Sequence, residues 1–147
     1  MREDRREVFN KLYGLANLVY IKLGGIEGII KSEGLPPRVE REALNKLSVV
    51  GYYLSEIIPM KLLGLTNPDL VDKKVSEMLE LADAVDVDVE LLFKCGWEVV
   101  DECIDLLNSL YYTVEKYVTR RRDLINVIND CIKRLEELRD EMKKYGV

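Results

Sequence analysis

The fold is decided by residues 89–145, VELLFKCGWEVVDECIDLLNSLYYTVEKYVTRRRDLINVINDCIKRLEELRDEMKKY, where core-type positions recur at alternating spacings of four and three. Only Gly96 and Arg121 interrupt the apolar series, and no proline or glycine lies between Gly96 and Gly146. Such a pattern is typical of coiled-coil heptads. It predicts one helix roughly 85 Å long, far more than the width of a small domain. Part of its seam must therefore meet a partner, unless the helix folds back.

The C-terminal half of this seam predicts a homo-oligomer, most simply a dimer, because the remaining helices are too short to cover it. Residues 119–145 would then form a coiled-coil arm that protrudes from a single domain spanning residues 1–147. Arg121 is the polar member of the seam and would set its register. The expected interface consists of Leu110, Val114, Tyr117, Arg121, Leu124, Ile128, Cys131, Leu135, Leu138 and Met142.

A chain reversal near Thr119 is the alternative, and it gives a five-helix bundle. Tyr117 is the midpoint between Cys103 and Cys131, so a hairpin there would set the two thiols against each other within one subunit. Thr119 would cap the second arm. The lack of glycine, proline or asparagine between Ser109 and Ile125 favours the unbroken helix.

Three shorter helices are predicted before the long one, at about residues 4–30, 37–58 and 68–85, and Pro59 and Gly64 mark a connection. In the second of them, small residues at Ser48, Gly51 and Ser55 form a line that would let another helix approach closely. The fold class is therefore all-α, a bundle of about four helices.

Composition limits the chemistry. The chain has no histidine, which excludes Ser-His and Cys-His nucleophile pairs, imidazole bases and the usual zinc sites. We therefore expect no cofactor, no metal ligand and no catalytic residue. Glutamine is also absent while charged residues make up 33%, a pattern of proteins from hot environments.

The cellular location is inferred from the N-terminal residues and from the most apolar segment of the chain. The start, MREDRRE, lacks the apolar segment of a secretory signal, so a cytoplasmic protein is expected. Residues 47–65 contain Glu56, Pro59 and Lys61, which argue against a membrane span. The three cysteines lack CxxC spacing and are interpreted as small buried hydrophobes.

A basic cluster at the start of the C-terminal arm offers a second function, nucleic-acid binding. Arginine with aromatic residues is the composition that contacts phosphate and stacks on bases. The net charge of −5 gives only a weak field, and residues 67–110 hold 12 acidic but 3 basic side chains. The candidate nucleic-acid residues are Arg120, Arg121, Arg122 and Tyr112.

Acidic pairs offer a third function. The spacings Glu77-x-x-Glu80, Glu98-x-x-Asp101 and Glu102-x-x-Asp105 resemble the ExxE and ExxD pairs of all-α nucleoside triphosphate pyrophosphatases of the MazG type. That resemblance implies carboxylates that hold Mg²⁺ against a triphosphate. Helical phase, however, places the carboxylates away from the apolar stripes. The sequence thus favours a non-enzymatic homo-oligomeric scaffold, or a small subunit of a larger intracellular complex.

Overall fold

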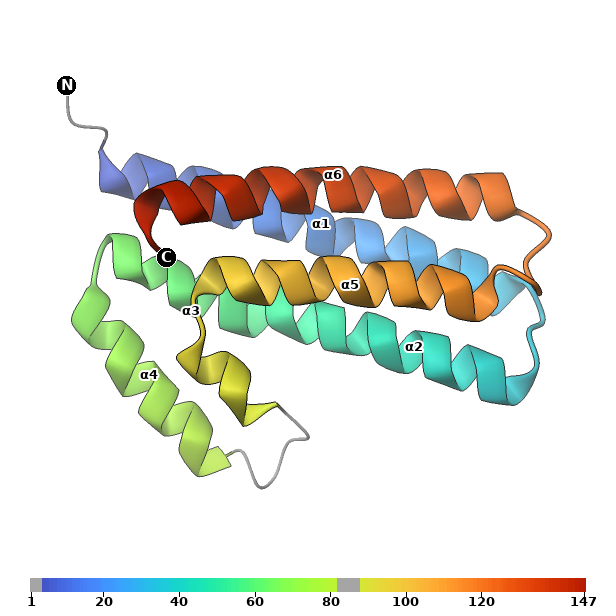
Figure 1. Ribbon diagram of the computed structural model, residues 1–147, viewed down its shortest axis with the longest axis horizontal. Coiled ribbons are helices and arrows are strands. Elements are labelled where there is room, and N and C mark those ends of the chain that lie inside the picture. The colour runs from blue at the N-terminus through green and yellow to red at the C-terminus, as the bar shows by residue number, and fades with distance from the viewer. Residues whose placement is uncertain (1–3, 82–87) are drawn as a thin grey trace.

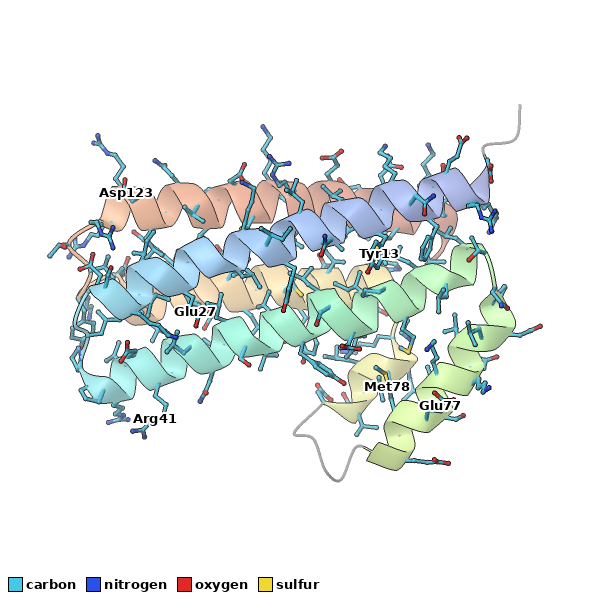
Figure 2. The ribbon with its side chains drawn as sticks, turned by 180° about the vertical axis from the view of Figure 1, so that it is seen from behind. Tyr13, Glu27, Arg41, Glu77, Met78 and Asp123 are labelled. Atoms are coloured by element: carbon cyan, nitrogen blue, oxygen red, sulfur yellow. The ribbon has the colours of Figure 1, made fainter. Side chains whose placement is uncertain are left out.

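The computed structural model describes residues 4–81 and 88–147, and every regular element within them is helical. The long helices pack side by side as a bundle, and a shorter helix, α4, projects at one end (Figure 1). Figure 2 views the opposite side, where α1 and α2 lie in front. The long helices are α1 (Arg5–Ser32), α2 (Pro37–Tyr52), α5 (Gly96–Val114) and α6 (Arg121–Tyr145), and the shorter ones are α3 (Ile58–Leu62) and α4 (Pro68–Leu81).

A single apolar core runs between the four long helices. Each helix buries one stripe at spacings of three and four residues, and α1 packs on α2 and α6 while α5 packs on the same two helices. Within residues 4–81 and 88–147 no polar or charged residue is buried. The stripe of α1 comprises Leu12, Ala16, Val19, Leu23, Ile26 and Ile30.

The prediction of one continuous helix over residues 89–145 is wrong. A short 3-10 helix, Val89–Phe93, ends before Lys94, and α5 begins only at Gly96. The chain then reverses over residues 115–120, so α5 and α6 form an antiparallel hairpin. The structure therefore has the turn near Thr119 that was the alternative prediction.

The hairpin also removes the reason for a protruding arm. α6 packs along α5 and α1, so residues 119–145 lie within the bundle. Of the ten expected interface residues, eight are buried inside a single chain, and only Tyr117 and Arg121 are exposed. The 4-3 pattern is satisfied because each arm of the hairpin covers the other. The buried eight are Leu110, Val114, Leu124, Ile128, Cys131, Leu135, Leu138 and Met142.

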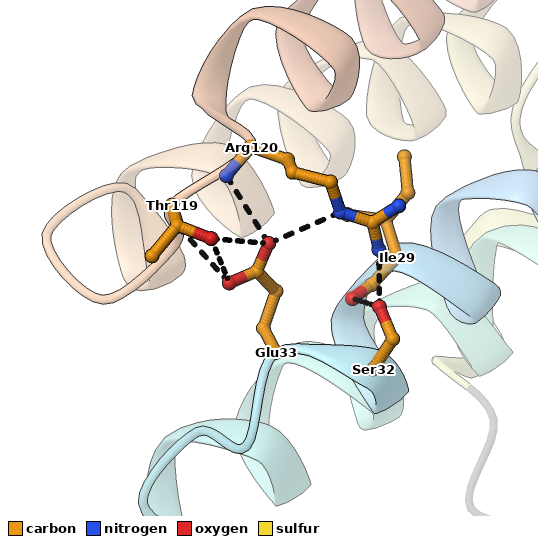
Figure 3. A network of polar contacts seen from close by, with 5 residues as sticks. All are labelled: Ile29, Ser32, Glu33, Thr119 and Arg120. Atoms are coloured by element: carbon orange, nitrogen blue, oxygen red, sulfur yellow. Dashed lines mark hydrogen bonds and ion pairs between the residues drawn. The ribbon is translucent and has the colours of Figure 1, made fainter.

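A carboxylate from the far end of α1 holds this reversal in place (Figure 3). Glu33 accepts hydrogen bonds from the backbone N–H of Thr119 (3.0 Å) and of Arg120 (3.1 Å). The Thr119 hydroxyl also donates to Glu33 (2.9 Å), so it does not cap α6 as predicted. Arg120 donates to the same carboxylate and to the Ser32 hydroxyl. These bonds, led by that of the Thr119 N–H, lower the pKa of Glu33 to about 2.

The start of α5 is fixed by close backbone packing. A Cβ at Gly96 would clash with Met142 and would lie 2.9 Å from the Cβ of Lys61, so only glycine fits without movement. Glu98 accepts from the Cys95 N–H at 2.8 Å, which caps the helix from within its first turn. Gly96, one of the two interruptions of the apolar 4-3 pattern, is where the helix begins.

The second predicted helix continues past its predicted end at Ile58. Its chain passes through a π-helical turn, Tyr53–Ile57, in which Ile58 N–H bonds to Tyr53 carbonyl, and goes on as α3. Pro59 has no N–H to donate, and the wider turn before it accommodates that loss. The predicted extension of α4 to Val85 lies outside the described residues.

Candidate protein-binding surface

A groove of about 530 Å³ lies between α1 and α2. Its floor is made by core residues such as Leu23 and Leu47, and its walls carry exposed or half-exposed aromatic and aliphatic side chains, Tyr20, Ile21 and Tyr52. Tyr20 and Ile21 are 45% and 64% exposed, respectively. The same groove is also lined by Glu27, Lys31 and two serines, so it is a concave surface of mixed polar and apolar character.

Two further hollows extend the groove toward the N-terminus of α1. The next, of about 110 Å³, shares Tyr20 and Ser55 with the first, and the third, of about 370 Å³, shares Tyr13, Ser55 and Pro59 with the second. Figure 2 places Tyr13 and Glu27 on the side of α1 that faces the α2–α3 segment, with Met78 of α4 near the far end. The three hollows therefore follow α1 from Lys31 to Phe9, a helix length of roughly 33 Å.

Small residues of α2 and of the π-helical turn that follows it make the groove hollow. Ser48, Gly51 and Ser55, which the sequence places on one line, all line it. A Cβ at Gly51 would be 3.6 Å from a ring carbon of Tyr20, an ordinary contact, so alanine fits there but a long side chain would fill the space. Within the chain, the helix that approaches this line is α1, through Tyr20 and Leu23.

Charged groups lie at the ends of the groove. At one end the Lys31 ammonium binds the Glu27 carboxylate at 2.7 Å, and that hydrogen bond raises the pKa of Lys31. At the other end Glu56, Lys74 and Glu77 border the third hollow. The middle offers hydroxyls and apolar surface. Its chemistry suits the apolar face of a helix with polar flanks.

The basic cluster is divided by the fold. Arg120 pairs with Glu33 at 3.4 Å, whereas Arg121 and Arg122 are exposed in the first turn of α6. Tyr112, near the end of α5, is 69% exposed, and its ring meets that of Tyr111 edge-on. The candidate residues therefore share one end of the bundle, but Arg120 has a structural role there.

The acidic pairs are likewise dispersed. Glu98 caps α5, Asp101 binds Arg139 of α6 at 3.1 Å, and Glu77 borders the third hollow. Among the residues whose placement is described, no group of three or more acidic or cysteine side chains could hold a metal ion. Glu98 and Asp101 thus support the bundle, at the start of α5 and between α5 and α6.

All three cysteines are free thiols. Cys103 and Cys131 are fully buried, whereas Cys95 is exposed. Burial raises the pKa of Cys103 and that of Cys131, the latter to about 11, so neither forms a thiolate readily. The interpretation as buried hydrophobes holds for these two and fails for Cys95.

Comparison of the chain with models of protein families, with curated proteins and with solved structures finds no match. In the described part of the chain, no helix combines the length and the apolar character needed to cross a membrane. The site must therefore be interpreted from its own geometry.

Proposed function

We propose that the protein is a non-enzymatic homo-oligomeric scaffold or small subunit of a larger complex, and that it works by binding other helices. The observation that carries the proposal is the row of three hollows along α1, which have small residues on the side opposite α1 and aromatic and aliphatic side chains in their walls. An amphipathic helix of five to six turns, roughly 30 Å, would match its length.

The association surface in this proposal differs from the C-terminal seam that the sequence favours, because that seam is used inside the chain. The exposed side of α1 and the groove beside it are open to a partner. Free thiols suit a reducing compartment, which supports the expected cytoplasmic location. The charge-rich composition supports the expected origin in a hot environment.

A photocrosslinking amino acid at Ser48, inside the groove, tests the proposal in cells of the native source. We expect a discrete adduct with a protein, and loss of that adduct when Gly51→Leu fills the groove. The same crosslinker at Asn45, exposed on α2 outside the groove, is the matched control. Adducts of equal yield at both positions would contradict a groove-specific partner.

Nucleic-acid binding is the second candidate, favoured by the exposure of Arg121, Arg122 and the rings of Tyr112 and Tyr117 at one end of the bundle. Calorimetry with single-stranded RNA and DNA separates it from the first, because such binding weakens steeply with salt. Phosphate release from nucleoside triphosphates in the presence of Mg²⁺ tests the third candidate, the pyrophosphatase. Our proposal expects neither signal.

A further inference from the structure

We propose that the turn between α5 and α6 is an oxyanion-binding site that the protein's own Glu33 carboxylate occupies, and that a phosphate group takes this place when Glu33 withdraws. The site lies at the end of the bundle where α1 and α5 end and α2 and α6 begin (Figure 3). Its residues are not among those that line the groove along α1, so this inference goes beyond the proposed function.

Four donor groups of the turn converge on the two oxygens of one carboxylate. Oε2 of Glu33 accepts from the Thr119 N–H at 3.0 Å and from the Thr119 hydroxyl at 2.9 Å. Oε1 accepts from the Arg120 N–H at 3.1 Å and from its Nε–H at 3.4 Å. Backbone N–H groups, a hydroxyl and a guanidinium are the donors with which proteins bind phosphate oxygens. Glu33 thus shows that these donors are already placed around an oxyanion.

The site is recessed from solvent and selects a negative charge. The Glu33 side chain is only 4% exposed, so the hydrogen bonds made there meet little competition from water. The N–H of Thr119, together with the other donors, lowers the pKa of Glu33 to about 2. The donors therefore favour the ionised over the neutral form of the group that they hold.

The turn carries more positive charge than Glu33 can neutralise. Residues 115–123 contain four basic side chains and two acidic ones, a net charge of +2. Arg121 and Arg122 are exposed, and in the described part of the chain neither forms an ion pair with a carboxylate. Glu33 supplies one negative charge, whereas a phosphate group carries nearly two and has more acceptor oxygens. Phosphate therefore matches the turn better than the carboxylate that occupies it.

Calorimetric titration of the full chain with inorganic phosphate at neutral pH tests the site. The donors belong to the turn and the carboxylate comes from α1, so Glu33→Ala leaves the donor set in place. We expect this variant to bind a single phosphate at least about tenfold more tightly than the parent, in which Glu33 competes. Arg120→Ala in the Glu33→Ala background should weaken that binding at least about tenfold. Glu136→Ala, which removes an exposed carboxylate elsewhere on α6, is the matched control and should behave as the parent does.

Thermal unfolding in phosphate, compared with chloride at equal ionic strength, tests the same site through its effect on stability. Phosphate should raise the Tm of Glu33→Ala more than that of the parent or of Glu136→Ala. Circular dichroism checks that the variants are helical, and if Glu33→Ala does not fold, Glu33→Gln takes its place in both measurements. A Tm shift of equal size in all proteins would be a general salt effect and would overturn the proposal. So would the absence of phosphate binding in the Glu33 variants, or binding that Arg120→Ala leaves unchanged.

A titration of the Glu33→Ala variant with AMP identifies the source of the phosphate group. Equal affinities for AMP and inorganic phosphate assign the site to the free anion. At least about tenfold tighter binding of AMP assigns it to the phosphate of a nucleotide. Loss of AMP binding with retention of inorganic phosphate again assigns it to the free anion, because the recess then excludes a larger group.

Discussion

The outer faces of α1 and α6 differ, although both helices bury an equally regular apolar stripe in one core. The exposed positions of α6 carry charges along its length, among them Arg122, Lys133, Glu137 and Lys144. The exposed face of α1 also carries charges near its ends, such as Glu7 and Lys11, but between residues 14 and 28 it carries glycines and exposed aliphatic side chains. Buried stripes are explained by folding, so only the outer faces distinguish a helix that meets solvent from one that meets a partner.

The largest expected effect comes from the stripe that α6 buries. Leu135→Ala should lower the free energy of unfolding by about 2–5 kcal/mol, because Leu135 is fully buried and its loss leaves a cavity. Urea unfolding followed by circular dichroism measures this, with exposed Glu136→Ala as the control. If the variant instead keeps its stability and loses only oligomeric mass, the stripe is an intersubunit seam after all.

Two glycines give effects of opposite sign. Gly96→Ala should destabilise the fold by about 1–3 kcal/mol, since the new methyl group meets Met142 and Lys61. Gly25→Ala should stabilise the monomer by up to about 1 kcal/mol, because nothing lies near its Cβ and alanine favours the helix. Thermal unfolding at concentrations that populate the monomer measures both. If both substitutions changed the stability of the monomer in the same direction, Gly96 could not be distinguished from Gly25 as a glycine that packing within the chain requires.

The turn between α5 and α6 should make stability depend on pH through Glu33. The pKa of this carboxyl is about 2 in the fold against 4.5 ordinarily, so the ionised form is favoured by folding. Its contribution is fully present above pH 4.5 and is lost as pH falls from about 4.5 toward 2.

Glu33→Gln should flatten the pH dependence of the unfolding free energy in that window and lower stability at neutral pH. Asp130, whose pKa is lowered chiefly by its hydrogen bond to Lys22, titrates in the same direction and remains in the variant. The difference between the two proteins therefore isolates Glu33. Glu136→Gln, on the exposed face of α6, is the matched control. Parallel curves for the parent and Glu33→Gln would show that the carboxylate does not hold the turn.

The helix class and the core stripes could be predicted from the sequence because apolar periodicity records local geometry directly. The stripe of α1 follows it from Leu12 to Ile30, and Pro37 and Pro68 open helices as expected. The hairpin could not be predicted with the same ease. Residues 115–120 keep the 4-3 phase across the reversal, and the carboxylate that fixes them, Glu33, lies 86 positions away from Thr119.

The candidate surface was only partly visible in the sequence. The line Ser48, Gly51 and Ser55 indicates one wall of the groove, whereas no pattern in the sequence shows that the glycines of α1 are exposed. Neither the open space around those glycines nor the exposure of Ile21 can be read from periodicity, because both depend on where α2 and α6 pack.

The smallest expected effect concerns Arg121, the predicted polar residue of the seam. It is exposed in the first turn of α6, so it does not occupy a core position. Arg121→Ala should therefore change the free energy of unfolding by no more than about 0.5 kcal/mol and leave the oligomeric mass unchanged. Arg120→Ala should do more, because it removes bonds to Glu33 and Ser32.

Denaturant unfolding measures the stability of Arg120→Ala and Arg121→Ala, and light scattering measures their oligomeric mass. The two residues are neighbours at the start of α6, but only Arg120 bonds to Glu33 and Ser32. A change of mass in Arg121→Ala would restore its role in register and transfer the association surface from α1 to the start of α6. A salt-dependent loss of single-stranded RNA or DNA binding in Arg121→Ala, at constant mass, would instead give the exposed face of α6 a ligand of its own. With neither change, the charges of α6 act as a solvated surface, and the groove beside α1 stays the proposed binding surface.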